Sequence, residues 1–237
     1  MLTISNLTKR YGKKTAVNRI SLEINAGDIV GFIGHNGAGK TTTLRCCSGI
    51  LEPDEGDIRI DGLSLRESPL ECKRRLAYIP DNPDLYEYLT GIRYLNFVAD
   101  VYGVSAADRA SRIERYATMF EIRNDLADPI RQYSHGMKQK IALISALIHE
   151  PKLIMLDEPF VGLDPVAAHR IKTVMRQMCD AGGAIFFSTH VLEVAEKLCD
   201  KIAIIRQGEI VVSGDTETVR GDSSLENVFL ELAENHV

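Results

Sequence analysis

The sequence of 237 residues carries a formal net charge of −5, and its 45% hydrophobic and 26% charged residues are ordinary proportions for one globular domain. This composition argues against a disordered chain, and the acidic balance argues against a nucleic-acid-binding surface. No apolar stretch approaches the roughly 20 residues of a membrane span, and residues 1–12 lack the basic start and apolar segment of a signal peptide. The five cysteines lack metal-binding spacing, so we expect a soluble, cytoplasmic chain with reduced thiols.

Short apolar strands alternate with longer helical patterns along most of the chain. Strands that are apolar on both faces, each followed by a helix, are typical of a parallel sheet covered by helices. Residues 57–62, DIRIDG, instead predict an antiparallel strand that ends in an Asp-Gly turn. In chain order, the pattern predicts strands at 2–7 and 28–34, a helix at 40–51, a strand at 152–158, a helix at 165–179 and a strand at 184–190.

The middle of the chain lacks strand signals and carries helical spacing in three stretches. We therefore expect a helical subdomain inserted into the α/β core. The final part predicts a hairpin with Gly208 in its turn, followed by an amphipathic helix. The chain is thus interpreted as one domain with a core at about 1–81 and 151–214, a helical subdomain at about 82–150 and a C-terminal helix at about 215–237.

Residues 34–41, GHNGAGKT, fit the pattern G-x-x-x-x-G-K-[ST] between a predicted strand and a predicted helix. The glycines let backbone N–H groups close around a polyphosphate, and the helix presents its positive N-terminal end to the same group. Lys40 is expected to bridge the outer phosphates of a nucleoside triphosphate, and the Thr41 hydroxyl to bind Mg²⁺. The candidate nucleotide-binding residues of this loop are Gly34, Asn36, Gly37, Ala38, Gly39, Lys40, Thr41 and Thr42.

Two apolar strands end in residues that suit phosphate chemistry. KLIMLDE ends in Asp157, a candidate Mg²⁺ ligand, and Glu158, a candidate to polarise an attacking water. AIFFSTH ends in His190, which can donate to a phosphate oxygen or to the water. Each of these residues alone is as consistent with a structural role. Their order behind a phosphate loop favours a catalytic site, because the carboxyl ends of parallel strands meet at one edge of a sheet.

The order of these motifs resembles that of the ATP-binding cassette (ABC) ATPases over nearly the whole chain. The resemblance implies a P-loop NTPase core with an N-terminal antiparallel β region and an inserted helical subdomain, acting on ATP with Mg²⁺. By the same resemblance, Tyr11 in TKRYG stacks on adenine, Asp164 in GLDP belongs to the loop after the acidic strand, and His190 is the switch histidine. Lys40, Glu158 and His190 are then the catalytic residues.

YSHGMKQK occupies the place of the ABC signature Leu-Ser-Gly-Gly-Gln and keeps Ser134 and Gly136. These two residues open a predicted helix and offer a hydroxyl and close backbone access, although a simple serine cap is the plainer interpretation. In the family this segment faces ATP held by a second copy, so the resemblance implies an ATP-dependent dimer. The S-x-G-M form is similar to the signature of a bacterial exporter subgroup.

Asp81 stands where the family generally has a glutamine that touches Mg²⁺ and senses the membrane partner. A carboxylate can bind Mg²⁺ but cannot donate a hydrogen bond as an amide can, so Asp81 is a candidate metal ligand whose coupling role is open. The aromatic-rich segment that begins at Leu85 is either the packed face of the helical subdomain or, at its start, part of a groove for a membrane subunit.

We interpret the chain as the Mg²⁺-dependent ATPase subunit of an ABC transporter, with export as the expected direction, at the cytoplasmic face of the cell membrane. Its expected partners are an integral membrane translocating subunit on a separate chain and a second nucleotide-binding domain, identical or related, with no nucleic acid. Two alternatives stay open: a non-transport ABC clamp on DNA, the ribosome or an assembly scaffold, and a nucleotide-binding regulator that does not turn over. The transported substrate is not encoded in these motifs.

Overall fold

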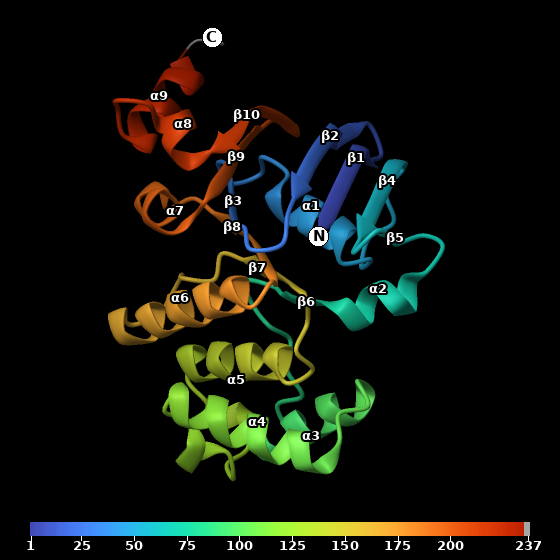
Figure 1. The fold of residues 1–237 in the computed structure, drawn as a ribbon, viewed down its shortest axis with the longest axis vertical. Helices are drawn as coiled ribbons and strands as arrows, with labels where there is room; N and C mark the ends of the chain where they lie inside the picture. Colours follow the sequence, from blue (N-terminus) through green and yellow to red (C-terminus); the bar gives the residue numbers. More distant parts are fainter. Residues whose placement is uncertain (235–237) are drawn as a thin grey trace.

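The computed structural model describes residues 1–234 and shows an α/β fold with two β-sheets and flanking helices (Figure 1). The larger sheet consists of β3 (Ile29–Ile33), β6 (Leu76–Ile79), β7 (Leu153–Asp157), β8 (Ala184–Thr189), β9 (Lys201–Arg206) and β10 (Glu209–Asp215). Its strand order is β10-β9-β3-β8-β7-β6, and every neighbouring pair is parallel except β9 and β10. The predicted parallel sheet is therefore confirmed.

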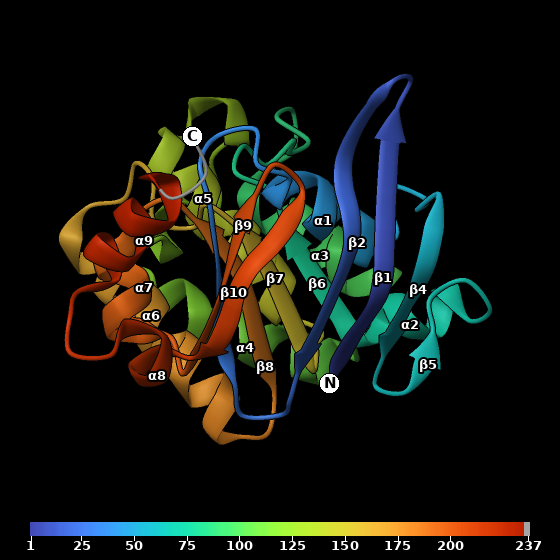
Figure 2. The ribbon, with the colours of Figure 1, turned by 90° about the horizontal axis from the view of Figure 1, so that it is seen from above.

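A smaller antiparallel sheet covers one side of the molecule (Figure 2). It consists of β1 (Leu2–Tyr11), β2 (Lys14–Ile24), β4 (Glu55–Ile60) and β5 (Leu63–Ser64), in the order β2-β1-β4-β5. Asp61 and Gly62, with φ of 53° and 80°, form the predicted Asp-Gly turn between β4 and β5. The sequence analysis did not predict β2, because irregularities in its pairing with β1 interrupt the simple apolar alternation of a strand.

The segment between β6 and β7 contains helices and no strand of either sheet. It forms one end of the molecule in Figure 1, away from the C-terminal helix. The residue before each of its three α-helices caps that helix: the side chains of Thr90, Ser105 and Ser134 each accept a hydrogen bond from the backbone N–H three residues later. The elements are α3 (Gly91–Val101), α4 (Ala106–Met119), η1 (Arg123–Asp125), η2 (Ile130–Gln132) and α5 (His135–Leu147).

The remaining helices flank the large sheet on both sides (Figure 2). They are α1 (Lys40–Cys47), α2 (Pro69–Arg75), α6 (Pro165–Asp180), α7 (Leu192–Leu198), α8 (Thr216–Arg220) and α9 (Leu225–Glu234). The predicted helix at 40–51 thus ends at residue 47. The last three residues of the predicted C-terminal segment, 235–237, lie outside the described residues.

Alternate residues of the large sheet enter two different hydrophobic clusters. In β7, Ile154 and Leu156 pack among residues of α3 to α7, whereas Leu153 and Met155 pack against the small sheet, α1 and α2. Because successive side chains of a strand point to opposite faces, the large sheet is buried on both sides. This double burial holds the carboxyl ends of β3, β7 and β8 in fixed positions.

All five cysteines are buried and unpaired, which is consistent with the predicted reduced thiols. Burial raises the pKa of the Cys46 thiol, at the end of α1, to about 11. Among the helices of residues 1–234, none has the length and apolar character needed to cross a membrane.

Tyr133, which stands where the signature motif usually has leucine, joins two parts of the helical segment. Its buried hydroxyl donates a hydrogen bond of 2.6 Å to the carbonyl oxygen of Asp125, and burial raises its pKa to about 12. A Cβ atom added to Gly91 would lie 2.3 Å from this hydroxyl, so the start of α3 is fitted against it.

Tyr133→Phe is expected to lower the free energy of unfolding by about 1 kcal/mol, because the Asp125 carbonyl loses one of its two hydrogen-bond donors and keeps only the N–H of Asp128. Urea unfolding followed by circular dichroism measures this change. Tyr88→Phe is the matched control, because Tyr88 is 89% exposed. Equal unfolding midpoints for wild type and Tyr133→Phe would contradict the role of this hydrogen bond.

Candidate functional site

The glycine loop joins the end of β3 to the start of α1. Gly39 is the residue before the helix and has a φ of 114°, and a Cβ atom there would lie 2.6 Å from the carbonyl oxygen of Ala16. Gly37 has a φ of 80°. Both positions favour glycine because L-residues with side chains resist positive φ. The loop therefore brings its backbone close to the N-terminus of α1, where unpaired N–H groups and the helix dipole favour an anion.

Lys40 folds back over this loop instead of pointing into solvent. Its side chain is only 5% exposed, and its ammonium group donates to the carbonyl oxygen of Gly34 at 2.6 Å. Glu158 Oε1 lies 3.4 Å from the same Nζ atom. The buried cation is thus held between the phosphate loop and the acidic end of β7.

Asp157 and Glu158 follow the last apolar residues of β7, as predicted. Asp157 is buried, and its Oδ1 accepts a hydrogen bond of 2.5 Å from the hydroxyl of Ser188 in β8. The same hydroxyl accepts a hydrogen bond of 3.1 Å from the backbone N–H of Glu158. Glu158 has a φ of 49°, a left-handed conformation that a non-glycine residue adopts only when its surroundings hold it there.

The carboxylate of Glu158 lies between Lys40 and His190. Its Oε2 lies 3.0 Å from His190 Nδ1 and accepts a weaker hydrogen bond, of 3.3 Å, from the His190 backbone N–H. Its Oε1 is buried and has no hydrogen-bond donor among the described residues, since Lys40 approaches without hydrogen-bond geometry. One oxygen of this carboxylate can therefore accept a hydrogen bond from a water molecule.

These groups open onto one pocket of about 330 Å³ at the N-terminal end of α1. His190 does not line the pocket but contacts Glu158, which does. Gly34 and Ala38 belong to the glycine loop but do not line the pocket. Tyr11 lies at the edge and is 49% exposed. The pocket brings together the predicted residues Tyr11, Asn36, Gly37, Gly39, Lys40, Thr41, Thr42, Asp81, Asp157 and Glu158.

The predicted metal ligands Thr41, Asp81 and Asp157 all line this pocket. Each offers oxygen, the donor that Mg²⁺ prefers in proteins. The residues present therefore fit a magnesium ion. Asp81 is exposed at the pocket, at the turn that follows β6.

Ser134, Gly136 and Asp164 do not line this pocket. The Ser134 hydroxyl caps α5 by accepting a hydrogen bond of 3.3 Å from the N–H of Met137, and no atom lies within 4 Å of a Cβ built on Gly136. Asp164 caps α6 in the same way, and the hydrogen bond from the N–H of Ala167 lowers the pKa of its carboxyl group. The start of α5 is thus a second accessible helix N-terminus, separate from the first.

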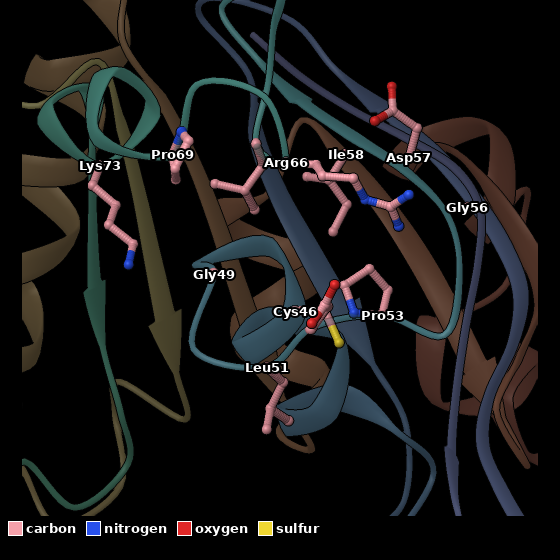
Figure 3. Close-up of a pocket in the computed structure, with 12 residues that line it drawn as sticks. Cys46, Gly49, Leu51, Pro53, Gly56, Asp57, Ile58, Arg66, Pro69 and Lys73 are labelled. Atoms are coloured by element: carbon pink, nitrogen blue, oxygen red, sulfur yellow. The ribbon is translucent and has the colours of Figure 1, made fainter.

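A second pocket, of about 230 Å³, lies at the other end of α1 (Figure 3). There the helix presents carbonyl oxygens and the negative end of its dipole, which disfavour a phosphate. Arg66 and Lys73 bring positive charge to this pocket, but much of its lining is apolar: Leu51, Pro53, Ile58, Leu65 and Pro69. The pocket at the N-terminal end of α1 is therefore the candidate site for a triphosphate.

Residues 17–161 match the protein family described as ABC transporter, and this range contains the glycine loop, Ser134, Asp157 and Glu158. The chain belongs to the ABC transporter family. The ABC-type transporter ATP-binding protein EcsA of Bacillus subtilis (strain 168) is 34% identical over 237 residues, which cover 98% of this chain and 96% of EcsA.

Two solved structures show the same fold. The ATP-binding subunit of an ABC transporter is 34% identical with a TM-score of 0.95, covering 99% of this chain and 100% of that one. A dimeric ATP-binding cassette in a post-hydrolysis state, bound to ADP and Pi, is 22% identical with a TM-score of 0.82, covering 91% and 99%. The predicted family, fold class and function are confirmed: this ABC protein is an ATP-binding, ATP-hydrolysing transporter subunit.

Several residues near the site of this ABC subunit were not predicted from its sequence. Lys14 lines the nucleotide pocket from the unpredicted strand β2. Gln139 of α5 is buried, and its side-chain amide donates to the carbonyl oxygen of Val161 at 3.0 Å, in the loop that follows Glu158. Ser188 gave only a weak signal, a hydroxyl two residues before His190 in an apolar strand.

Ser188→Ala is expected to lower ATP hydrolysis about 10- to 100-fold, because it removes the hydroxyl that orients the Asp157 carboxylate and the Glu158 backbone. Phosphate release at saturating ATP and magnesium measures the effect. Ser145→Ala is a matched control, since this buried serine of α5 donates to the Ala142 carbonyl and does not line the nucleotide pocket. Wild-type turnover in Ser188→Ala would contradict the proposed importance of this contact.

Proposed function

We propose that Glu158 activates the water that attacks the γ-phosphate of ATP. The observation that carries this proposal is the buried Glu158 Oε1, which has no hydrogen-bond donor among the described residues and belongs to a residue that lines the pocket beside the phosphate loop. As the water oxygen bonds to the γ-phosphorus, the bond from phosphorus to the bridging oxygen breaks, releasing ADP and phosphate. Glu158 polarises the water and accepts its proton, and His190 holds the other carboxylate oxygen and donates to the phosphate.

Binding of ATP is assigned to the loop and the N-terminus of α1. Backbone N–H groups of the glycine loop and of the start of α1 donate to the phosphate oxygens, and Lys40 leaves the Gly34 carbonyl to bridge the outer phosphates. The half-exposed ring of Tyr11 at the pocket edge stacks on adenine. Lys40 is therefore expected to neutralise phosphate charge only after the nucleotide has displaced the contact between Lys40 and Glu158.

Thr41, Asp81 and Asp157 would hold Mg²⁺, which when bound supplies positive charge to the phosphate oxygens. Ser188 keeps the Asp157 carboxylate in one orientation. Asp81 is the unusual member of this set, because it adds a negative charge where an amide is usual in the family. A carboxylate at this position is expected to strengthen binding of the ion.

A second nucleotide-binding domain is proposed to complete the site. Ser134 and Gly136 lie at an accessible helix N-terminus, away from the pocket of their own chain, and so can reach the γ-phosphate bound by another copy. Asp164, in the loop between β7 and α6, is proposed to belong to the same nucleotide-binding set. ATP would then lie in the interface and its hydrolysis would weaken the dimer. The solved relative of the same fold is a dimer, which is consistent with this arrangement.

Glu158→Gln is expected to retain ATP binding, to lower hydrolysis about 10²- to 10⁴-fold and to accumulate as a dimer with ATP and Mg²⁺. Glutamine keeps the shape of the side chain but cannot accept the proton. Steady-state phosphate release and light scattering after size exclusion measure the two effects. Lys40→Ala is the comparison, since it is expected to lose ATP binding and to stay monomeric. Wild-type turnover in Glu158→Gln would refute the assignment.

The transporter partner is proposed to be an integral membrane subunit that binds beside the start of α3, with export as the direction suggested by the S-x-G-M signature. Here Tyr86, 59% exposed, packs edge-on against Tyr94 and Phe97, with ring centroids 6.2 and 5.5 Å away. Exposed aromatic rings that are held by one another suit a short helix from a partner. The segment that carries Tyr86 begins just after Asp81, which lines the nucleotide pocket, so the chain connects this surface to the pocket.

Tyr86→Ser is expected to reduce recovery of a membrane-spanning partner with the tagged chain after gentle detergent extraction, because the aromatic contact surface is lost. Recovery is measured by mass spectrometry of the purified complex. Val211→Ser on β10 is the control, since Val211 is also exposed but belongs to the other end of the fold. Equal recovery of the membrane-spanning partner with Tyr86→Ser and with the wild type would contradict a role for this surface in binding it.

A further inference from the structure

The C-terminal helix α9 lies beside the phosphate loop, although about 190 residues separate the two in the chain. The ring of Phe229 packs against the ring of His35, with centroids 4.6 Å apart and planes tilted by 57°. His35 is the second residue of the glycine loop, and it lines the nucleotide pocket. A side chain of α9 therefore contacts a residue of the ATP site directly.

Contacts at both ends of α9 fix the helix in this position. Leu225, its first residue, is fully buried, and its backbone N–H donates to Glu196 of α7 at 2.9 Å. Near the other end, Arg206 at the end of β9 donates to the carbonyl oxygen of Leu232 at 2.6 Å. Phe229 lies between these anchors and is itself partly buried against the core. The ring that faces His35 is thus presented by a helix held at both ends.

His35 governs the shape of the loop through its backbone. Its carbonyl oxygen accepts a hydrogen bond of 3.1 Å from the N–H of Ala38, and Lys40 Nζ lies 3.4 Å from the same oxygen. On the other side of the loop, the N–H of Gly208 donates to the Ala38 carbonyl at 2.9 Å. The loop is therefore supported from two directions, by the turn between β9 and β10 and by α9.

We propose that Phe229 is a positioning residue for ATP binding, which acts through His35 to keep the phosphate loop in the conformation that receives the triphosphate. This inference rests on the proposed nucleotide site and adds a role for the C-terminal helix. Without the Phe229 ring, the His35 side chain loses its support and the loop samples conformations in which its N–H groups diverge. Part of the binding free energy is then spent on ordering the loop.

Phe229→Ala is expected to raise the dissociation constant of ATP about 2- to 10-fold, the range that a lost aromatic pair gives. A fluorescent N-methylanthraniloyl derivative of ATP, titrated against the purified full chain, measures the constant. Leu230→Ala is the matched control, because Leu230 is the next residue of the same helix and is 52% exposed. It is expected to bind the probe like the wild type.

A double-mutant cycle tests whether Phe229 acts through His35. If it does, His35→Ala and Phe229→Ala each weaken binding, and the double variant binds no more weakly than the weaker single variant. Additive losses would overturn the proposal, as would an unchanged constant in Phe229→Ala or an equal loss in Leu230→Ala.

Two further variants keep the test decisive. Phe229→Leu preserves apolar packing against the core and replaces Phe229→Ala in the cycle if the alanine variant does not fold. Lys40→Ala shows the signal of a defective nucleotide site. A wild-type chain that binds the probe no better than Lys40→Ala would refute the nucleotide site itself, whereas tight wild-type binding with an unaffected Phe229 variant would refute only the role of α9.

Discussion

The candidate site depends on the contact between the carboxyl ends of β7 and β8. Parallel pairing sets Asp157 beside Ser188, and the serine hydroxyl then bonds both the Asp157 carboxylate and the Glu158 backbone. That contact holds Glu158 in a left-handed conformation, with its carboxylate between Lys40 and His190. The buried sheet supplies the rigidity, because neither strand can shift without exposing apolar residues on both faces.

The phosphate loop is supported by parts of the chain that lie far from it in sequence. The carbonyl of Ala16 in β2 approaches Gly39, the turn at Gly208 bonds Ala38, and α9 packs on His35. A glycine-rich loop has many accessible conformations, so ordering it costs conformational entropy that these contacts offset. The loop can then bind a triphosphate without first reorganising, which increases affinity.

Much of the site could be predicted from the sequence because its chemistry is local. The loop around Lys40 and the acidic end of β7 each consist of adjacent residues, so their spacing alone predicts a phosphate cradle and a metal ligand. The apolar strands likewise predicted the parallel sheet. The strand β2 escaped prediction because its irregular pairing breaks the alternation of apolar residues, and Lys14 was missed with it.

The sequence by itself determined the family, the parallel sheet and the candidate phosphate-binding residues, since short-range patterns of glycine, charge and apolar side chains encode them. Only the tertiary structure decided which of these residues share one pocket. It placed Tyr11, Asp81 and Glu158 around the N-terminus of α1, and left Ser134 at a separate helix end. It alone brought Ser188 to Asp157 and Phe229 to His35. Such contacts arise from strand register and helix packing, which depend on the whole core and leave no local pattern.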